Sequence, residues 1–338
     1  MAARSTARAR VAVMGSGSWG TAFSMVVADA GHDVRLWARR PELAAAINGQ
    51  RHNPDYLPSI TLPETIHAVS EPDEAMDKAD IVVLAVPAQT LRGNLGEWHI
   101  PGDALVVSLA KGVELTSCLR MSEVVAAAGG VEPERIGVVT GPNLSQEIAE
   151  RQPSASVVAS VDAATAKELQ RVCHTALFRA YTNHDVVGCE LGGATKNVIA
   201  LAVGMGMGLG LGSNAAASVI TRGLAELTRL GVALGADPHT LAGLAGLGDL
   251  VATCLSPLSR NRTFGEALGR GRTVAEITAS TRQVAEGVKS CASIQELAAR
   301  HDVELPIVHN VAAVIAGDLT PSEGIRALMS RSAKAERD

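Results

Sequence analysis

A glycine-rich loop between two apolar runs is the feature that most constrains how this chain can fold. Gly15, Gly17 and Gly20 form a Gly-x-Gly-x-x-Gly motif that follows a predicted strand over 10–15 and, after a helical pattern, precedes another over 34–38. Strand, glycine loop, helix and strand within about 30 residues is the context in which this motif binds a dinucleotide. The motif alone is weak, because a chain with 33 glycines among 338 residues can contain it as an ordinary turn. The flanking strands favour a dinucleotide-binding site.

The three glycines would have separate physical functions in such a site. Gly15 would permit the tight turn, Gly17 would let the backbone approach a pyrophosphate, and Gly20 would let the helix pack closely on the sheet. The pyrophosphate would lie at the N-terminus of the helix, where free N–H groups and the helix dipole favour an anion.

The end of the second strand indicates which dinucleotide is accepted. A site selective for NAD would carry Asp or Glu there, to accept a hydrogen bond from the ribose 2′-hydroxyl. This chain instead has Arg39 and Arg40, and a pair of guanidinium groups suits the 2′-phosphate of NADP. We therefore expect NADPH to be accepted, and favour a preference for it over NADH. In the alternative interpretation, both arginines are solvated loop charges.

Length and composition limit the other classes of function. A chain of 338 residues, 47% of them apolar, is long enough for about two domains with sizeable cores. Its net charge of −5 argues against a nucleic-acid-binding surface. Five cysteines without paired spacing, and no apolar signal segment, predict reduced thiols in a cytoplasmic protein. Nine histidines form no i,i+4 pair and no cluster with the cysteines, so no metal site is expected.

Strands alternate with helical patterns in the first half of the chain, and the second half reads as helices. This order predicts an α/β fold: a mostly parallel Rossmann-type sheet domain over 10–189, then an all-α domain over 190–338. Residues 1–9 are predicted to be a disordered basic leader. The predicted strands cover 10–15, 34–38, 66–69, 81–86, 104–109, 136–140, 155–160 and 178–182, and the predicted helices include 218–234, 274–280 and 288–300.

One segment has the length of a membrane span. Residues 197–221 contain no charged side chain, but glycine alternates with Met, Leu and Val between 204 and 212. Such a segment has poor helix propensity and is only modestly apolar. We therefore expect a buried, partly irregular core segment and no membrane span.

Two lysines are candidates for the chemistry, which a dinucleotide-binding domain alone does not define. Reduction of a carbonyl requires a proton donor and a cation near the developing negative charge. Lys111 follows the predicted strand over 104–109, and Lys196 opens the most apolar helix of the chain. A lysine at an apolar helix start can be desolvated, which lowers its pKa toward neutrality. Taken alone, each is more simply explained as a surface lysine whose stem lies along the protein.

Further motifs occur in order along almost the whole chain, and together they resemble those of the bacterial NAD(P)-dependent glycerol-3-phosphate dehydrogenases. The most specific are the Lys-Asn helix at 190–200, Leu-Gly-Asp-Leu at 247–250 and Ser-Arg-Asn at 259–261. The others are Gly-Ser-Gly-Ser-Trp-Gly-Thr-Ala at 15–22, Asn-Pro-Asp-Tyr-Leu-Pro at 53–58, Val-Pro-Ala-Gln at 86–89, Ala-Lys-Gly at 110–112, Thr-Gly-Pro-Asn at 140–143 and Val-Ala-Glu-Gly at 284–287.

The resemblance implies reversible hydride transfer between NAD(P)H and C2 of dihydroxyacetone phosphate, giving sn-glycerol 3-phosphate for glycerophospholipid synthesis. It implies Lys196 as the proton donor and acceptor, with Lys111 and Asp249 beside the reacting centre. The implied cofactor-binding residues are Gly15, Gly17, Ser18, Trp19, Gly20, Arg39, Arg40, Tyr56, Lys111, Ser145, Arg260, Val284 and Glu286. The implied substrate-binding residues are Lys111, Gly141, Asn143, Lys196, Asp249, Ser259, Arg260 and Asn261. A homodimer through the helical domain is a further family expectation.

Two positions leave alternatives open. Asp249 is unusual beside an anionic substrate, so it would accept a hydrogen bond from a substrate hydroxyl or orient a lysine; alternatively, it caps the helix after Gly248. The segment 141–145 departs from the family pattern, which often has Ser or Thr after the proline and a small residue two positions later. Asn143 can still form hydrogen bonds, but the sequence does not fix its contacts or those of Ser145.

Two other functions compete with this one. A dehydrogenase of the 6-phosphogluconate or 3-hydroxyisobutyrate type would also have a lysine on the junction helix, but the Leu-Gly-Asp-Leu and Ser-Arg-Asn segments count against it. An NADP(H)-binding sensor without catalysis would lack an intact proton-transfer site, whereas Lys111, Lys196 and Asp249 are all present. Glycerol-3-phosphate dehydrogenase activity is therefore favoured.

Overall fold

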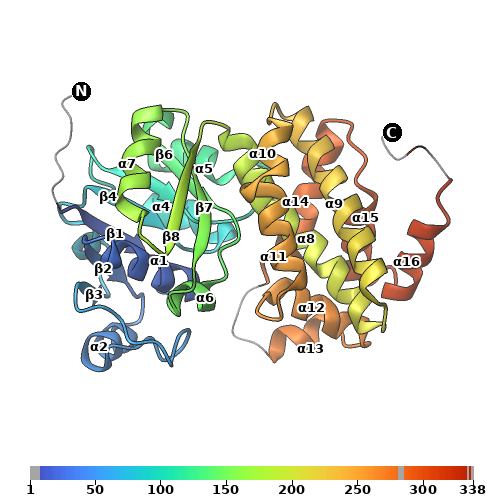
Figure 1. Cartoon of the computed structure of the whole chain (residues 1–338), viewed down its shortest axis with the longest axis horizontal. Helices are drawn as coiled ribbons and strands as arrows, with labels where there is room; N and C mark the ends of the chain where they lie inside the picture. Colours follow the sequence, from blue (N-terminus) through green and yellow to red (C-terminus); the bar gives the residue numbers. More distant parts are fainter. Residues whose placement is uncertain (1–7, 281–284, 333–334, 336–338) are drawn as a thin grey trace.

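The chain folds into a sheet domain followed by a helical domain (Figure 1). The computed structural model describes residues 8–280, 285–332 and 335. An eight-stranded sheet has the order β3-β2-β1-β4-β5-β6-β7-β8, and every neighbouring pair is parallel except β6 and β7. The structure therefore confirms the predicted mostly parallel, Rossmann-type sheet with an all-α domain after it.

The strands lie where the apolar runs predict them. They are β1 (Arg10–Met14), β2 (Asp33–Trp37), β3 (Ile66–Val69), β4 (Ile81–Leu84), β5 (Leu105–Ser108), β6 (Ile136–Thr140), β7 (Ser154–Ala159) and β8 (Phe178–Asn183).

Helices connect the strands and then form the second domain. Those of the sheet domain are α1 (Ser18–Asp29), α2 (Pro41–Gln50), α3 (Pro72–Met76), α4 (Leu91–Glu97), α5 (Met121–Gly129), α6 (Ser145–Ala149) and α7 (Ala163–Cys173), with short turns η1 (Ala88–Thr90) and η2 (Pro133–Arg135). Those that follow are α8 (Val186–Gly208), α9 (Ser213–Ala233), α10 (Pro238–Ala242), η3 (Leu244–Gly248), α11 (Asp249–Leu255), α12 (Arg260–Gly269), α13 (Val274–Ala279), α14 (Glu286–Arg300), α15 (Pro306–Ala316) and α16 (Pro321–Met329).

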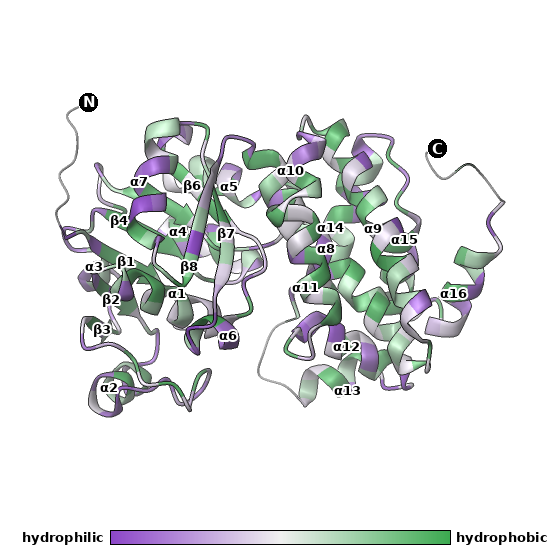
Figure 2. Ribbon diagram, in the orientation of Figure 1, coloured by the Kyte–Doolittle hydropathy of each residue, from purple (hydrophilic) through white to green (hydrophobic). Residues whose placement is uncertain are grey.

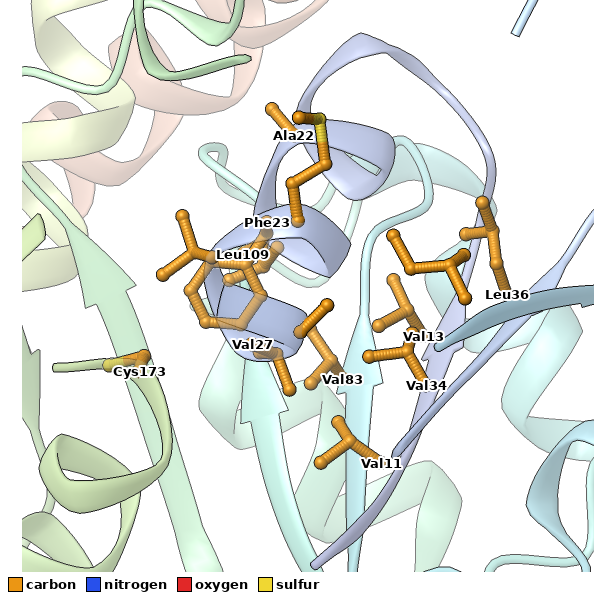
Figure 3. Close-up of a cluster of buried hydrophobic side chains, with 14 of the residues drawn as sticks. Val11, Val13, Ala22, Phe23, Val27, Val34, Leu36, Val83, Leu109 and Cys173 are labelled. Carbon is orange, nitrogen blue, oxygen red and sulfur yellow. The ribbon is translucent and has the colours of Figure 1, made fainter. Parts of the chain in front are cut away.

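Both faces of the sheet are covered, because successive side chains of its central strand enter different cores. Val11 and Val13 of β1 pack into the cluster that contains α1 (Figure 3). Ala12 and Met14 pack into the cluster that contains residues of α3, α4 and α5. Period-two alternation with both sides apolar is what a strand covered on both faces requires. Hydrophobic residues accordingly gather in the strands and in α8, and α7 carries hydrophilic stretches (Figure 2).

Two sequence-based boundaries differ from the structure. Ala9, which was assigned to the predicted leader, is buried, and its N–H donates to Nδ1 of His32 at 3.0 Å. Residues 1–7 of that leader lie outside the described residues. The predicted domain boundary after Cys189 falls inside α8, so the two domains share this helix and no separate linker joins them.

The expectation of a buried, partly irregular segment over 197–221 is confirmed in part. The segment is helical in α8 as far as Gly208 and again in α9 from Ser213, with an irregular stretch over 209–212 between the two helices, and burial is confined mainly to its first part. α8 is also long and apolar enough by composition to cross a membrane, but 89% of its apolar window is buried inside the protein. It is therefore the core helix of the second domain.

Glycines let α8 approach α12 at backbone distance, which explains their spacing in a buried helix. A Cβ added to Gly204 would lie 2.1 Å from the carbonyl oxygen of Arg262, and one on Gly208 would lie 2.2 Å from that of Glu266. The contact is reciprocal, because a Cβ on Gly265 of α12 would lie 2.2 Å from the carbonyl oxygen of Leu201. Close packing therefore outweighs the low helix propensity of glycine here.

The five cysteines are all free and buried in the structure. They belong to different elements and contribute to the cores of both domains.

We predict that Gly204→Ala destabilises the fold, whereas Gly206→Ala does not. The new methyl group at 204 would overlap the backbone of α12, and overpacking of this kind costs on the order of 1–3 kcal/mol. A methyl group at 206 would have its nearest neighbour, a side-chain carbon of Leu211, at 3.7 Å. Denaturant unfolding of the two variants and the wild type measures the difference. Equal stability of both variants would show that α8 and α12 can separate without loss.

Candidate active site

The candidate site lies where the carboxyl ends of β1, β5 and β6 meet the helices of the second domain. The glycine loop follows β1, Lys111 follows β5, and Gly141 follows β6. Lys196 comes from α8, and Asp249 is the first residue of α11. The carboxyl edge of a parallel sheet is the usual ligand site in such folds.

A buried carboxylate joins the two candidate lysines. Oδ2 of Asp249 accepts a hydrogen bond from Nζ of Lys111 at 2.6 Å, and Oδ1 accepts one from Nζ of Lys196. Asp249 is 1% exposed, so both contacts are made away from solvent. The carboxylate does not cap α11, because Gly248 occupies the N-cap position and no side-chain hydrogen bond caps it. Both lysines therefore keep a common partner that fixes their ammonium groups.

Burial gives Lys196 an unusual pKa. The side chain is almost fully enclosed, and desolvation lowers its pKa to about 8, while Asp249 opposes this change and Lys111 adds to it. Nζ also donates to Oγ1 of Thr253 at 2.7 Å. A lysine with a pKa of about 8 is mostly protonated at neutrality but retains a neutral fraction far larger than an ordinary lysine does, which suits an acid–base group.

Thr253 was missed by the sequence analysis. It lies one helical turn after Asp249 on α11, and i,i+4 spacing places the two side chains on one face of the helix. Its hydroxyl accepts from Lys196 and also donates to Oδ1 of Asp249 at 3.3 Å. The signal available in the sequence was this spacing within the Leu-Gly-Asp-Leu-Val-Ala-Thr segment.

Asn261 is engaged in a buried chain of amide groups. Its Nδ2 donates to Oδ1 of Asn197 at 2.9 Å, and its Oδ1 accepts from the N–H of Gly287 at 2.9 Å. Asn197 in turn donates to the backbone oxygens of Gly193 at 3.3 Å and Lys111 at 3.5 Å. The side-chain amide of Asn261 has two N–H bonds, and the one not donated to Asn197 remains for the predicted substrate contact.

The other members of the Ser-Arg-Asn segment lie at the start of α12. Ser259 is the buried N-cap, with its oxygen accepting from the N–H of Arg262 at 3.2 Å. The Arg260 guanidinium is reachable by solvent, although surrounding protein lowers its pKa; nearby Glu286 and Tyr56 act in the opposite direction. Burial raises the pKa of Glu286, against the influence of Arg260, and its Oε2 has no hydrogen-bond partner in the described structure.

The loop after β6 lines the site with backbone and amide groups. Gly141 has φ +126°, and its carbonyl oxygen accepts from Nζ of Lys111 at 3.0 Å. Nδ2 of Asn143 donates to the hydroxyl of Ser156 at 3.1 Å, while Oδ1 of Asn143 is buried without a partner. Ser145 begins the short helix α6. The departure from the family pattern at 143 thus leaves one oriented acceptor in place.

The glycine loop has the shape that a bound pyrophosphate needs. Gly15 has φ +132°, and a Cβ there would lie 2.6 Å from the carbonyl oxygen of Ala85. A Cβ on Gly20 would lie 2.0 Å from the carbonyl oxygen of Gly15, so the loop and α1 are in backbone contact. A Cβ on Gly17 would meet nothing within 4 Å, and no side chain caps α1 there. The loop therefore leaves an open, uncapped helix start, and its residues fit a dinucleotide cofactor.

The remaining predicted cofactor residues belong to several segments of the chain. Ser18 and Trp19 begin α1, with the indole of Trp19 packed edge-on to Phe23. Arg39 and Arg40 are exposed after β2, and Tyr56 lies in the segment that follows α2. Val284 lies outside the described residues.

An acidic residue that the sequence analysis missed lies against the arginine pair. Asp55 forms an ion pair with Arg40, which also lies 3.8 Å from a carboxylate oxygen of Glu42. Asp55 is distant from the end of β2 in the sequence, and the segment after α2 brings it to Arg40. Arg40 is therefore partly neutralised within the chain itself.

Comparisons with known proteins agree with this architecture. The N-terminal model of NAD-dependent glycerol-3-phosphate dehydrogenases matches residues 10–166, and the C-terminal model matches residues 185–326. Proteins named glycerol-3-phosphate dehydrogenase (NAD(P)+) from Streptomyces avermitilis and Thermobifida fusca are each 61% identical to this chain, over 97% of it and 98% of their own length. The crystal structure of glycerol-3-phosphate dehydrogenase from Coxiella burnetii is 36% identical, with a TM-score of 0.91, over 96% of this chain and 99% of that one.

Two family models that together match most of the chain, and relatives of this identity, confirm the resemblance found in the motifs. They also confirm NAD or NADP as the cofactor and an oxidoreductase activity. This chain belongs to the family of NAD(P)-dependent glycerol-3-phosphate dehydrogenases.

Proposed function

We propose that Lys196 is the proton donor and acceptor in the interconversion of dihydroxyacetone phosphate and sn-glycerol 3-phosphate. The observation that carries this proposal is the enclosed ammonium group, held by Asp249 and Thr253 and having a pKa of about 8. Such a group donates a proton to the C2 oxygen during reduction and removes one during oxidation. Bound NAD(P)H supplies the hydride that is added to C2.

The charges of the centre favour the transition state of carbonyl reduction. Lys111 and Lys196 share the single carboxylate of Asp249. When both lysines are protonated, these three side chains together carry one excess positive charge in a buried, poorly solvated centre. Negative charge that develops on the C2 oxygen is stabilised there more strongly than in water. Asp249 holds the two ammonium groups close to the position proposed for this oxygen. Of the roles considered for Asp249, we therefore propose that it orients the lysines.

The start of α12 is the proposed site for the substrate phosphate. Arg260 is a solvent-reachable cation beside the free N–H groups of that helix, and guanidinium groups bind phosphate through two parallel hydrogen bonds. The remaining side-chain N–H of Asn261 would also donate a hydrogen bond to this phosphate. Gly141, Asn143 and Ser259 remain proposed substrate contacts.

Arg39 is proposed as the main ligand of the 2′-phosphate of NADP. Arg40 already pairs with Asp55, and that carboxylate would repel a second anion placed on Arg40. This arrangement supports use of both cofactors, with NADPH favoured through Arg39. Ser18, Trp19, Tyr56, Ser145 and Glu286 remain proposed cofactor contacts.

The cellular setting stays a prediction from the sequence. We infer that the glycerol 3-phosphate formed supplies glycerophospholipid synthesis. The five free, buried cysteines support the predicted cytoplasmic location. A homodimer through the helical domain is still expected from the family.

We predict that Lys196→Ala lowers kcat for dihydroxyacetone phosphate reduction by about 10²–10⁴-fold, the usual contribution of a positioned acid–base group. NADPH binding should be retained, because Lys196 acts in the transition state. Loss of NADPH absorbance measures turnover, and titration of NADPH fluorescence measures binding. Lys167→Ala, at an exposed position of α7, is the matched control and should behave as wild type. If Lys196→Ala turned over at the wild-type rate, Lys196 would not be the proton donor and acceptor.

The pH dependence should have opposite signs in the two directions. Reduction needs protonated Lys196, so kcat/KM for dihydroxyacetone phosphate should fall as the pH rises through about 8. Oxidation needs the neutral amine, so kcat/KM for glycerol 3-phosphate should rise through the same range. Initial rates in both directions in one constant-ionic-strength buffer series test this. Flat profiles across this range in both directions would contradict the proposed role.

Replacement of Arg39 and Arg40 by glutamine should weaken NADPH more than NADH. Loss of charged hydrogen bonds to the 2′-phosphate should reduce the NADPH/NADH ratio of kcat/KM by about tenfold or more. Arg39→Gln alone should account for most of the effect. Asp55→Asn should act in the opposite direction, since it releases Arg40. Equal losses for both cofactors would mean that the arginines have a structural role.

A further inference from the structure

Asn53 is a buried polar residue that the function described so far does not use. It is 0% exposed, although Pro54 and Asp55 directly after it are exposed. Its carbonyl oxygen accepts from the N–H groups of Tyr56 at 3.3 Å and Leu57 at 2.9 Å, which closes a tight turn over 53–57. Leu57 anchors the far end of this turn in the core. The turn therefore fixes the Asn53 side chain against the glycine loop.

The carboxamide of Asn53 holds two points of that loop. Nδ2 donates to the carbonyl oxygen of Ser16 at 2.8 Å and to Oγ1 of Thr21 at 2.8 Å. The hydroxyl of Thr21 donates to the same Ser16 oxygen at 3.3 Å. Three side-chain and backbone groups thus form a closed ring of hydrogen bonds, and all three residues are buried.

This ring sets the direction of a peptide group at the cofactor site. In a trans peptide the C=O and N–H point in opposite directions. Because the Ser16 carbonyl is held toward Asn53, the Gly17 N–H of the same peptide points away from Asn53. We propose that Asn53 is a positioning residue, which aims the Gly17 N–H and the start of α1 at the pyrophosphate of the cofactor.

A purely structural role explains the side chain less well. Oδ1 of Asn53 is buried without a hydrogen-bond partner, which is unfavourable for a fully enclosed amide. A leucine of similar size would fill the same space without an unpaired polar atom. What asparagine provides beyond packing is therefore the pair of hydrogen bonds donated by its Nδ2. The same turn also places Asp55 on Arg40 and carries Tyr56, both at the proposed cofactor site.

The pyrophosphate is common to both cofactors, so loss of Asn53 should affect them equally. We expect Asn53→Leu to raise the dissociation constants of NADPH and NADH by a similar factor of about ten. Their ratio should stay at the wild-type value. In this respect the variant differs from the arginine variants, which change the ratio. Titration of the purified protein, followed by cofactor fluorescence or calorimetry, measures both constants without turnover.

Asn48→Leu is the matched control. Asn48 lies on α2 in the same domain and exchanges two hydrogen bonds of 2.8 Å with the backbone of Ala68, away from the glycine loop. It should lose stability without a change in either dissociation constant. In steady-state assays, Asn53→Leu should raise the KM of each cofactor by a larger factor than it lowers kcat.

Thr21→Val provides a second variant if Asn53→Leu does not fold. It keeps the shape of Thr21 but removes the hydroxyl of the ring, and it should raise both dissociation constants by a few-fold. Wild-type affinity for both cofactors in Asn53→Leu and Thr21→Val would overturn the proposal. So would an equal loss of affinity in Asn48→Leu, or a loss confined to NADPH. Each of these outcomes would overturn the role of Asn53 without contradicting the proposed dehydrogenase function.

Discussion

One buried carboxylate governs how the two halves of this protein fit together. Asp249 belongs to the helical domain, yet it binds Lys111 from the sheet domain and Lys196 from α8. A buried charge left without its partners is strongly unfavourable, so the two domains must approach until both contacts form. The same requirement that fixes the domain arrangement therefore assembles the reacting centre.

Helix α8 transmits this arrangement into the second domain. Its first half carries Lys196, and its second half meets α12 at Gly204 and Gly208 without intervening side chains. The position of Arg260 at the start of α12 thus depends on backbone contact with the helix that carries Lys196. A substrate with a carbonyl and a phosphate a few bonds apart needs such a fixed separation between its two binding groups.

Sequence patterns predicted the sheet and three residues of the candidate centre because the relevant signals are local. Apolar runs located the strands, and the family motifs identified Lys111, Lys196 and Asp249, which the structure brings together. Thr253 and Asn53 were missed because their importance comes from partners distant in the chain. The helical conformation of the glycines at 204–208 was not expected, because propensity alone cannot anticipate that a second helix packs closely on them.

Burial of every cysteine has a consequence for how this enzyme responds to oxidants. Desolvation raises the pKa of the Cys173, Cys254 and Cys291 thiols to about 12 and raises those of Cys118 and Cys189 as well. The thiolate is the form that reacts with peroxides and alkylating reagents, and it is scarce at such pKa values. The thiols of folded molecules should therefore remain unmodified under oxidative conditions, and thiol labelling would mark only molecules that have opened.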